Sequence, residues 1–146
     1  GCGRTCSAAE KSKTERNLCK MKTCVITENF SCDPSKVWLY LTKPTLNSWR
    51  KDVRDYEESD GGRRMVEHHN DGSTTEMNFT RFEKPRSLSG SFQKGKLSGT
   101  FTVILLGGGD STSLECTLEI KGLGLFGKPK KLLQERMTML HNALGA

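Results

Sequence analysis

Apolar and polar residues alternate along much of the chain after residue 50, which is the pattern of β-strands that bury one face. The alternation is clearest in 88–93, 97–106 and 113–121, where every second residue is apolar or small and most of the others are Ser, Thr or Glu. Antiparallel sheets commonly pack one face on the core and leave the other in water. These three runs therefore predict neighbouring antiparallel strands with one apolar face.

Turn residues divide the rest of this region into further strands. The predicted strands cover 53–58, 64–69 and 75–83, and an earlier β-rich run covers 25–30. The segments between strands are rich in Gly, Asn, Asp and Pro: Asp60-Gly61-Gly62, Asn70-Asp71-Gly72, Lys84-Pro85, Lys94-Gly95 and Gly107-Gly108-Gly109-Asp110. These residue types favour tight turns. The pattern predicts one early strand and six later strands joined by short connections.

Helices are predicted on both sides of these six strands. Asp33 is a favourable N-cap and Pro44 ends the helix that follows it, and a second short helical turn is expected to hold Leu46 and Trp49. A long helix closes the chain, because apolar residues recur there at helical spacing. They are Leu132, Leu133, Met137, Leu140 and Leu144.

The order of elements, together with several local motifs, resembles the START-related superfamily, also called SRPBCC or polyketide-cyclase-like proteins. The resemblance covers about residues 23–144. The resemblance rests on four features: a first strand followed by Cys32-Asp33-Pro34-Ser35-Lys36-Val37-Trp38, the stretch 41–49, Lys84-Pro85-Arg86 between strands, and the closing amphipathic helix. The resemblance implies an α+β helix-grip fold, as in birch-pollen-type allergens. In this fold a seven-stranded antiparallel sheet wraps around a long C-terminal helix, with two short helices after the first strand.

The resemblance also implies a cavity between the sheet and the last helix, where a hydrophobic or amphipathic small molecule, lipid-like or polyketide-like, would bind. The small residues Gly90, Gly99 and Cys116 are expected to leave part of this space unfilled, and Phe126, in the glycine-flanked segment 122–127, is expected to act as a lid. The predicted ligand contacts are Trp49, Met77, Phe79, Gly90, Phe92, Gly99, Phe101, Val103, Cys116, Leu118, Phe126, Leu133 and Met137. The competing interpretation is that the bulky members of this set simply close the core.

Two other functions stay open from the sequence. One is an enzyme of the cyclase or dehydratase kind, with Glu67, His69 and Arg81 as candidate acid-base groups, since alternation through Met65 and Met77 can place them on the inner face. A register shifted by one residue would send Glu67 and His69 to solvent instead. The other is a protein-interaction module like the co-chaperone branch of the superfamily, which would show a filled core and an exposed apolar patch.

The net charge of +6 does not indicate a nucleic-acid partner. Residues 1–22 account for +4 of it, because they hold six basic residues against Glu10 and Glu15, so the remaining chain carries only +2. Residues 1–22 also contain no Phe, Tyr or Trp to stack on bases. We therefore expect no nucleic-acid binding.

The six cysteines do not form a strong metal motif. Four of them, Cys2, Cys6, Cys19 and Cys24, have the spacing C-x3-C-x12-C-x4-C, which allows a zinc site but lacks the C-x2-C pairs typical of one. A disulfide framework is the other alternative. Reduced thiols, no metal and no cofactor are the expectation, since a chain with a patterned core does not need crosslinks.

The first residues suggest a separate segment. We expect 1–22 to be a basic, disordered extension and 23–144 to be the START-like domain. Gly1-Cys2-Gly3-Arg4-Thr5 matches the permissive myristoylation pattern, and a cloning remnant is the alternative interpretation. The longest apolar run, 103–106, is only as long as a strand, so no membrane span is expected. Without a secretory hydrophobic segment, the cytoplasm is the expected location.

Overall fold

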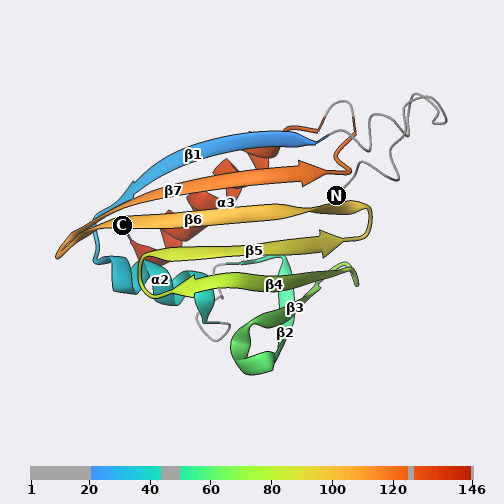
Figure 1. The fold of residues 1–146 in the computed structure, drawn as a ribbon, viewed down its shortest axis with the longest axis horizontal. Helices are drawn as coiled ribbons and strands as arrows, with labels where there is room; N and C mark the ends of the chain where they lie inside the picture. Colours follow the sequence, from blue (N-terminus) through green and yellow to red (C-terminus); the bar gives the residue numbers. More distant parts are fainter. Residues whose placement is uncertain (1–20, 44–49, 125–126, 146) are drawn as a thin grey trace.

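Seven antiparallel strands form one sheet in the computed structural model, which describes residues 21–43, 50–124 and 127–145. The order across the sheet is β1-β7-β6-β5-β4-β3-β2, so the first and last strands of the chain are neighbours (Figure 1). The strands are β1 (Lys22–Phe30), β2 (Val53–Ser59), β3 (Arg64–His69), β4 (Thr74–Glu83), β5 (Ser87–Lys94), β6 (Leu97–Gly108) and β7 (Ser111–Lys121). Each of the seven predicted strands is present within three residues of its expected ends.

Two helices accompany the sheet in the described ranges: α2 (Pro34–Thr42) and α3 (Pro129–Leu144). Helix α2 begins as predicted, because the Asp33 carboxylate accepts a hydrogen bond from the Ser35 backbone N–H at 2.7 Å and Pro34 occupies the first turn. A short 3-10 turn, η2 (Asp60–Gly62), joins β2 to β3. The second short helix predicted around Leu46 and Trp49 falls in 44–49, outside the described residues.

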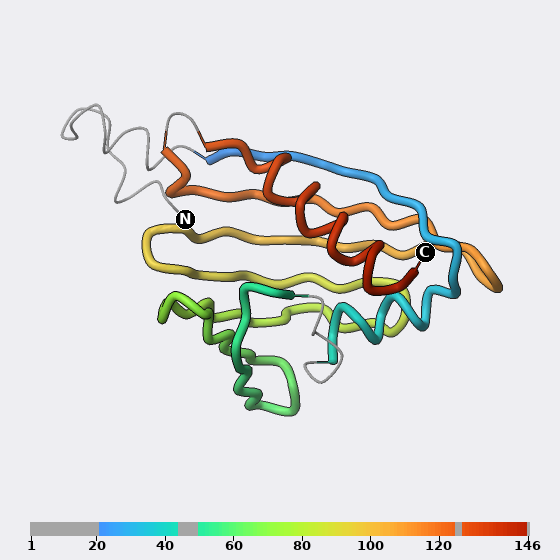
Figure 2. The backbone as a smooth tube through the Cα atoms, turned by 180° about the vertical axis from the view of Figure 1, so that it is seen from behind, coloured from blue at the N-terminus to red at the C-terminus, as the bar shows by residue number. Residues whose placement is uncertain are grey.

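Helix α3 lies across one face of the sheet (Figure 2). Its buried side consists of Leu133, Met137, Leu140 and Leu144, as the helical spacing predicted. Near its C-terminal end, the His141 ring stacks on Phe30 with a centroid distance of 4.2 Å, and its Nε2 lies 3.0 Å from a carboxylate oxygen of Glu28. Both partners belong to β1, so these contacts fix this part of α3 against the sheet.

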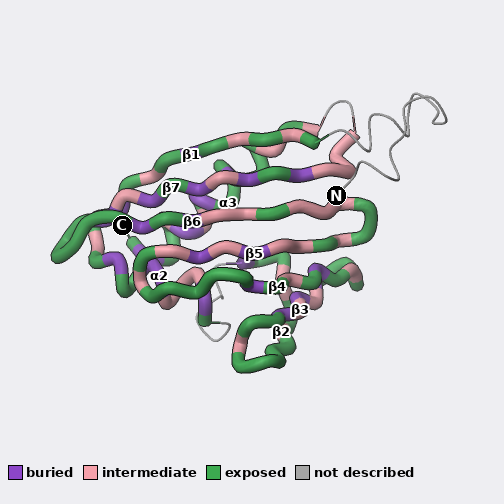
Figure 3. Tube along the Cα trace, in the orientation of Figure 1, coloured by how far each residue is buried: buried purple, intermediate pink, exposed green. Residues whose placement is uncertain are grey.

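Buried residues recur along the strands of the sheet (Figure 3), and most of the buried ones are apolar. Strand β7 shows the alternation best, because Thr112, Leu114, Cys116, Leu118 and Ile120 are all buried and the residues between them are not. These findings confirm the predicted helix-grip architecture, with its seven-stranded antiparallel sheet and long C-terminal helix. None of the described helices is long and apolar enough to cross a bilayer.

A β-bulge in β4 overturns one expectation about the inner face. The pairing of β4 with β5 shifts register between Phe79 and Arg81, so strict alternation ends there. Phe82 turns toward the core, where its ring packs edge-on against Trp38 at a centroid distance of 5.1 Å. Arg81 is exposed instead and faces Glu83, with Nε and Oε1 3.6 Å apart. The expectation that Arg81 shares the inner face with Met77 is therefore wrong.

Candidate functional site

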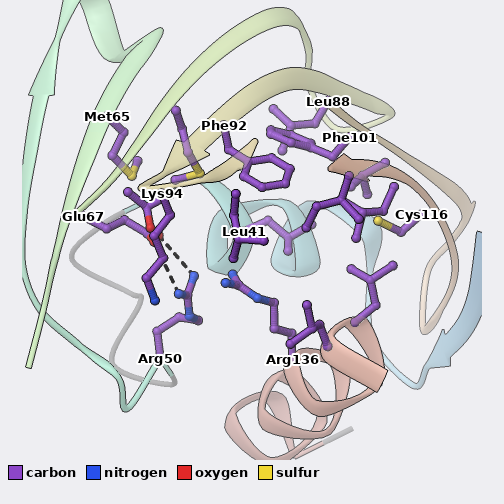
Figure 4. Close-up of a pocket in the computed structure, with 18 of the residues that line it drawn as sticks. Leu41, Arg50, Met65, Glu67, Leu88, Phe92, Lys94, Phe101, Cys116 and Arg136 are labelled. Atoms are coloured by element: carbon purple, nitrogen blue, oxygen red, sulfur yellow. Dashed lines mark hydrogen bonds and ion pairs between the residues drawn. The ribbon is translucent and has the colours of Figure 1, made fainter. Parts of the chain in front are cut away.

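A cavity of about 290 Å³ lies between the inner face of the sheet and helix α3 (Figure 4). Strands β3 to β7 supply most of its wall, α3 supplies Leu132, Leu133, Arg136 and Met137, and α2 supplies Leu41. Most of the lining is apolar: the strands contribute Met65, Met77, Phe79, Leu88, Phe92, Leu97, Phe101, Val103, Cys116, Leu118 and Ile120. Binding sites for small molecules typically combine such a lining with a few polar groups.

Nine of the predicted ligand contacts line this cavity. They are Met77, Phe79, Phe92, Phe101, Val103, Cys116, Leu118, Leu133 and Met137. Trp49 and the expected lid residue Phe126 lie outside the described residues. Near the expected lid, the Lys22 ammonium donates hydrogen bonds to the carbonyl oxygens of Gly124 and Gly127, at 2.6 Å and 2.5 Å.

Gly90 and Gly99 do not line the cavity, contrary to the prediction. A Cβ added at Gly99 would lie 2.0 Å from the backbone oxygen of Glu119, and one added at Gly90 would lie 2.4 Å from the backbone oxygen of Asn78. Both contacts are with neighbouring strands and not with open space. These glycines permit close approach of backbones within the sheet. The cavity therefore owes its volume to the spacing between sheet and helix.

The polar end of the cavity is built on a buried ion pair between Arg50 and Glu67. Arg50 Nη1 donates to Glu67 Oε2 at 3.1 Å, and Arg50 Nη2 donates to Glu67 Oε1 at 3.3 Å. The two side chains are only 5% and 3% exposed, although one precedes β2 and the other lies in β3. A paired geometry of this kind is what allows two opposite charges to remain inside a protein.

Asp52 holds Arg50 from the other side. Arg50 Nε donates to Asp52 Oδ1 at 3.1 Å and Arg50 Nη2 donates to Asp52 Oδ2 at 3.0 Å. Burial alone would raise the pKa of Asp52, but the hydrogen bonds and charge of Arg50 outweigh burial and lower the pKa to about 2. The carboxylate is therefore ionised at neutral pH and neutralises part of the Arg50 charge.

His69 is buried beside this ion-pair network and does not line the cavity. Its Nε2 lies 2.7 Å from the Thr75 hydroxyl, which itself lines the cavity. Its Nδ1 lies 3.3 Å from Asp52 Oδ2 without forming a hydrogen bond to any described residue. His68, the next residue, points to the opposite face and contacts Glu57 at 2.7 Å. Neighbouring residues of a strand point to opposite faces, so one of the two histidines is inside and the other is outside.

Tyr56 is the cross-strand partner of Glu67 in the β2–β3 pair. Its hydroxyl is buried and has no hydrogen-bond partner within the described part of the chain. Burial, reinforced by the negative charge of Glu67, raises the pKa of Tyr56 to about 12. The phenol is thus protonated at neutral pH and keeps a hydrogen to donate.

Arg136 approaches the same cluster from helix α3. Figure 4 shows its side chain extending into the cavity toward Arg50. The Arg136 side chain is partly exposed to solvent. Partial desolvation of its guanidinium and then the positive charge of Arg50 lower the pKa of Arg136, while the charges of Glu67 and Asp52 act in the opposite direction. Lys94, at the end of β5, is a further cation of the lining.

The three catalytic candidates thus have different surroundings. Glu67 lines the cavity but both of its carboxylate oxygens accept hydrogen bonds from Arg50. His69 is buried behind the wall, and Arg81 is on the outer surface. The predicted set is therefore not assembled around the cavity.

Sequence reasoning missed Arg50 and Arg136. The sequence does indicate that Arg136 faces inward, because it lies three residues after Leu133 and four before Leu140, within the apolar stripe of the last helix. No sequence pattern indicates the position of Arg50, since it lies in a connection whose geometry depends on the folded sheet. The turn that carries it is held by Asn70, whose backbone N–H donates to the Asp52 carbonyl at 2.9 Å and whose side chain donates to the Lys51 carbonyl at 2.8 Å.

The cysteines of the described segments offer neither a metal site nor an activated nucleophile. Cys24, Cys32 and Cys116 are free thiols, and no group of metal-ligating side chains is found among the described residues. Burial raises the pKa of Cys116 to about 12, so its thiol is protonated and unreactive. Cys2, Cys6 and Cys19, which the zinc alternative requires, lie outside the described residues.

Comparison with solved structures shows that this fold is widely shared. The chain is similar to protein MLL2253 of Mesorhizobium loti, with a TM-score of 0.69 and 19% identity over 85% of this chain and 97% of that one. It is also similar to Mll3558 of Rhizobium loti, with a TM-score of 0.64 and 19% identity over 86% and 95% of the two chains. A START superfamily protein of Mycobacterium smegmatis matches with a TM-score of 0.62 and 14% identity over 84% and 93%.

No model of a known protein family matches the sequence, and no curated protein matches it. The similarities above are therefore similarities of fold, that of START-like proteins.

Proposed function

We propose that this chain, which has the helix-grip fold of START-like proteins, binds a hydrophobic or amphipathic small molecule, lipid-like or polyketide-like, between its sheet and helix α3. The observation that carries the proposal is the cavity of about 290 Å³, whose wall is apolar except at one end. Ligand pockets in proteins are typically clefts or cavities of roughly 300–1,000 Å³, and this one lies at the small end of that range. A space equal to about ten waters at roughly 30 Å³ each suits a ligand better than a packing defect.

The ligand contacts of this proposal are the nine predicted residues that line the cavity, together with Arg50, Glu67 and Arg136 at its polar end. Trp49 and Phe126 stay as predictions, the second as a lid over the ligand. Gly90 and Gly99 are not proposed as contacts, because neighbouring backbones occupy the space that their side chains would need. The three free thiols among the described residues suit a reducing compartment such as the cytoplasm.

An enzyme of the cyclase or dehydratase kind is the second candidate, and the position of Glu67 favours it. This buried carboxylate faces the same apolar space in which a ligand would lie. Protonation of Glu67 would disrupt its ion pair with Arg50, because it removes the carboxylate charge that this buried pair requires. The binding proposal requires no such disruption.

A protein-interaction module has less support. That alternative predicts a filled core and a contiguous apolar patch, whereas this core contains a cavity. Among the exposed apolar residues of the sheet, Val25 on β1 is separated from Ile104 and Leu106 on β6 by the polar outer residues of β7, and the partly exposed Phe82 lies on β4, beyond β5.

Titration with the neutral dye N-phenyl-1-naphthylamine tests the binding proposal. The dye fluoresces more strongly in apolar surroundings, so saturable one-to-one enhancement is expected with the wild-type protein. Val103→Phe adds bulk inside the cavity and should weaken dye binding by about tenfold or more. Cys116→Met adds an unbranched, flexible side chain to the same wall and should weaken it less.

Ile104→Phe is the matched control, because Ile104 follows Val103 on β6 but faces outward and is 36% exposed. It should bind the dye like the wild type. The unfolding midpoint of every variant is measured alongside. Absence of saturable binding by the wild type, or equal binding by folded Val103→Phe and Ile104→Phe variants, would rule out the cavity as the binding site.

A further inference from the structure

Building on the proposed binding function, we propose that the ligand of this cavity is an amphipathic carboxylic acid, and that the guanidinium of Arg136 binds its carboxylate. The apolar part of such a ligand would lie along Phe92, Phe101 and Cys116. Its acidic group would lie at the polar end, between α3 and the Arg50–Glu67 pair.

The placement of Arg136 is the first argument. Leu133 and Met137, on either side of it in α3, both line the cavity, and so does Arg136. Its side chain extends toward the guanidinium of Arg50 (Figure 4). Two guanidinium groups therefore face the same space from opposite walls, and their like charges disfavour one another.

The carboxylates of the cluster are the second argument, because they are already engaged. Arg50 donates to both oxygens of Glu67 and to both oxygens of Asp52. Within the described part of the chain, Arg136 makes no hydrogen bond and no ion pair. Its side chain reaches solvent as well as the cavity, and a guanidinium carries five N–H donors in a planar fork that suits a carboxylate.

The charge balance of the wall is the third argument. Arg50, Lys94 and Arg136 line the cavity and carry three positive charges, whereas Glu67 is the one carboxylate of the described lining. The partly exposed Asp52 behind Arg50 still leaves the cations in excess. A neutral ligand would leave this excess uncompensated, and a cationic ligand would increase it.

The volume limits the size of the acid. About ten water volumes, at roughly 30 Å³ each, hold one medium-length chain or one or two rings and not a two-chain lipid. Arg136 would bind the carboxylate of an aliphatic acid and that of an aromatic acid in the same way. The experiment below therefore includes one of each.

Binding of two matched pairs of probes tests the proposal: decanoate against decanol, and 2-naphthoate against 2-naphthalenemethanol. Affinities are obtained from displacement of N-phenyl-1-naphthylamine and from calorimetry at neutral pH. A charge-assisted hydrogen bond strengthens binding by about tenfold to a hundredfold, so the acid should exceed its alcohol by that factor in at least one pair. The pair that binds more tightly identifies the skeleton.

Arg136→Gln should reduce the affinity for the acid by about tenfold or more and leave that for the alcohol nearly unchanged. Arg136→Lys keeps the charge but loses the planar fork, so it should fall between the wild type and Arg136→Gln. Lys131→Gln is the matched control: it removes one positive charge from the exposed side of the same helix and should retain the preference for the acid.

Equal binding of acid and alcohol by the wild type would overturn this inference without any variant, and dye binding in the same experiment would leave the proposed function standing. An undiminished preference for the acid in folded Arg136→Gln would overturn the role of Arg136. If neither the dye nor any probe binds, the proposed function and this inference both fail.

Discussion

At the apolar end of the cavity, Leu88, Phe101 and Cys116 come from three adjacent strands, β5, β6 and β7, and each points inward by simple alternation. At the polar end, Arg50 comes from a connection, Glu67 from β3 and Arg136 from the last helix. The two ends share one space (Figure 4) but differ in how their residues depend on one another. Packing at the apolar end is a sum of many small contacts, whereas the Arg50 and Glu67 charges at the polar end rely on each other.

This difference predicts which amino-acid substitutions each end of the cavity tolerates. An apolar wall accepts substitutions that preserve volume and hydrophobicity. A buried ion pair tolerates the loss of both charges better than the loss of one, because the remaining charge is left without compensation. The two ends of the cavity can therefore be distinguished by how single and double substitutions affect unfolding.

Glu67→Leu should produce the largest effect, a loss of about 3 kcal/mol in the free energy of unfolding, because it removes the buried carboxylate that pairs with the buried Arg50 guanidinium. The double variant Arg50→Met/Glu67→Leu should lose less than this single variant. Urea denaturation at neutral pH provides the measurement.

Glu76→Gln serves as the control, since the Arg64–Glu76 pair joins the neighbouring strands β3 and β4 at 3.3 Å but is 44% and 51% exposed. Removing this surface pair should cost less than about 0.5 kcal/mol. If Glu67→Leu proved no more costly than Glu76→Gln, the polar end would not depend on its buried pair.

Leu88→Ala should have an intermediate effect, about 2 kcal/mol, because this 4% exposed side chain packs in the wall but has the cavity on one side and so fewer contacts to lose. The enlarged cavity should still bind N-phenyl-1-naphthylamine. The control Leu106→Ala, on the outer face and 59% exposed, should change stability by less than about 0.5 kcal/mol. Loss of dye binding in folded Leu88→Ala would show that the apolar wall also depends on individual residues.

The dependence of stability on pH should show the smallest effect, through Asp52. Its pKa of about 2 in the folded protein lies below its ordinary value of 3.8, so ionised Asp52 stabilises the fold fully above about pH 4. This contribution is lost as the pH falls through about 2. Since the Asp52 side chain is 48% exposed and water screens its charge, we expect at most about 1 kcal/mol.

Urea midpoints between pH 5 and pH 2 measure this contribution by comparing the wild type with Asp52→Asn. The wild type should be the more stable at pH 5, and the difference should shrink toward zero at pH 2. Asp110→Asn, at an exposed turn residue, should show no such trend. A difference between wild type and Asp52→Asn that stays constant with pH would mean that Asp52 acts through packing and not through its charge.

Much of the fold and of the apolar wall could be predicted from the sequence, because both follow from local periodicity. A period of two assigns Met77, Val103 and Leu118 to the inner face of a strand, and helical spacing assigns Leu133 and Met137 to the inner face of the last helix. The same rule failed for Arg81, where a bulge inserts one residue into β4. It also failed for the space around Gly90 and Gly99, because a small residue in a strand can mean either a void or a close backbone approach.

The sequence by itself determined the strands, the capped start of α2, the stripe of α3 and the inward direction of most of the wall. Only the tertiary structure decided that Arg50, Glu67 and Arg136 meet, since 17 residues separate the first two and the third comes from the opposite layer. Periodicity places a side chain on a face of its own element. It contains no information on which distant charge lies opposite, because that depends on how the sheet curves and where the helix packs.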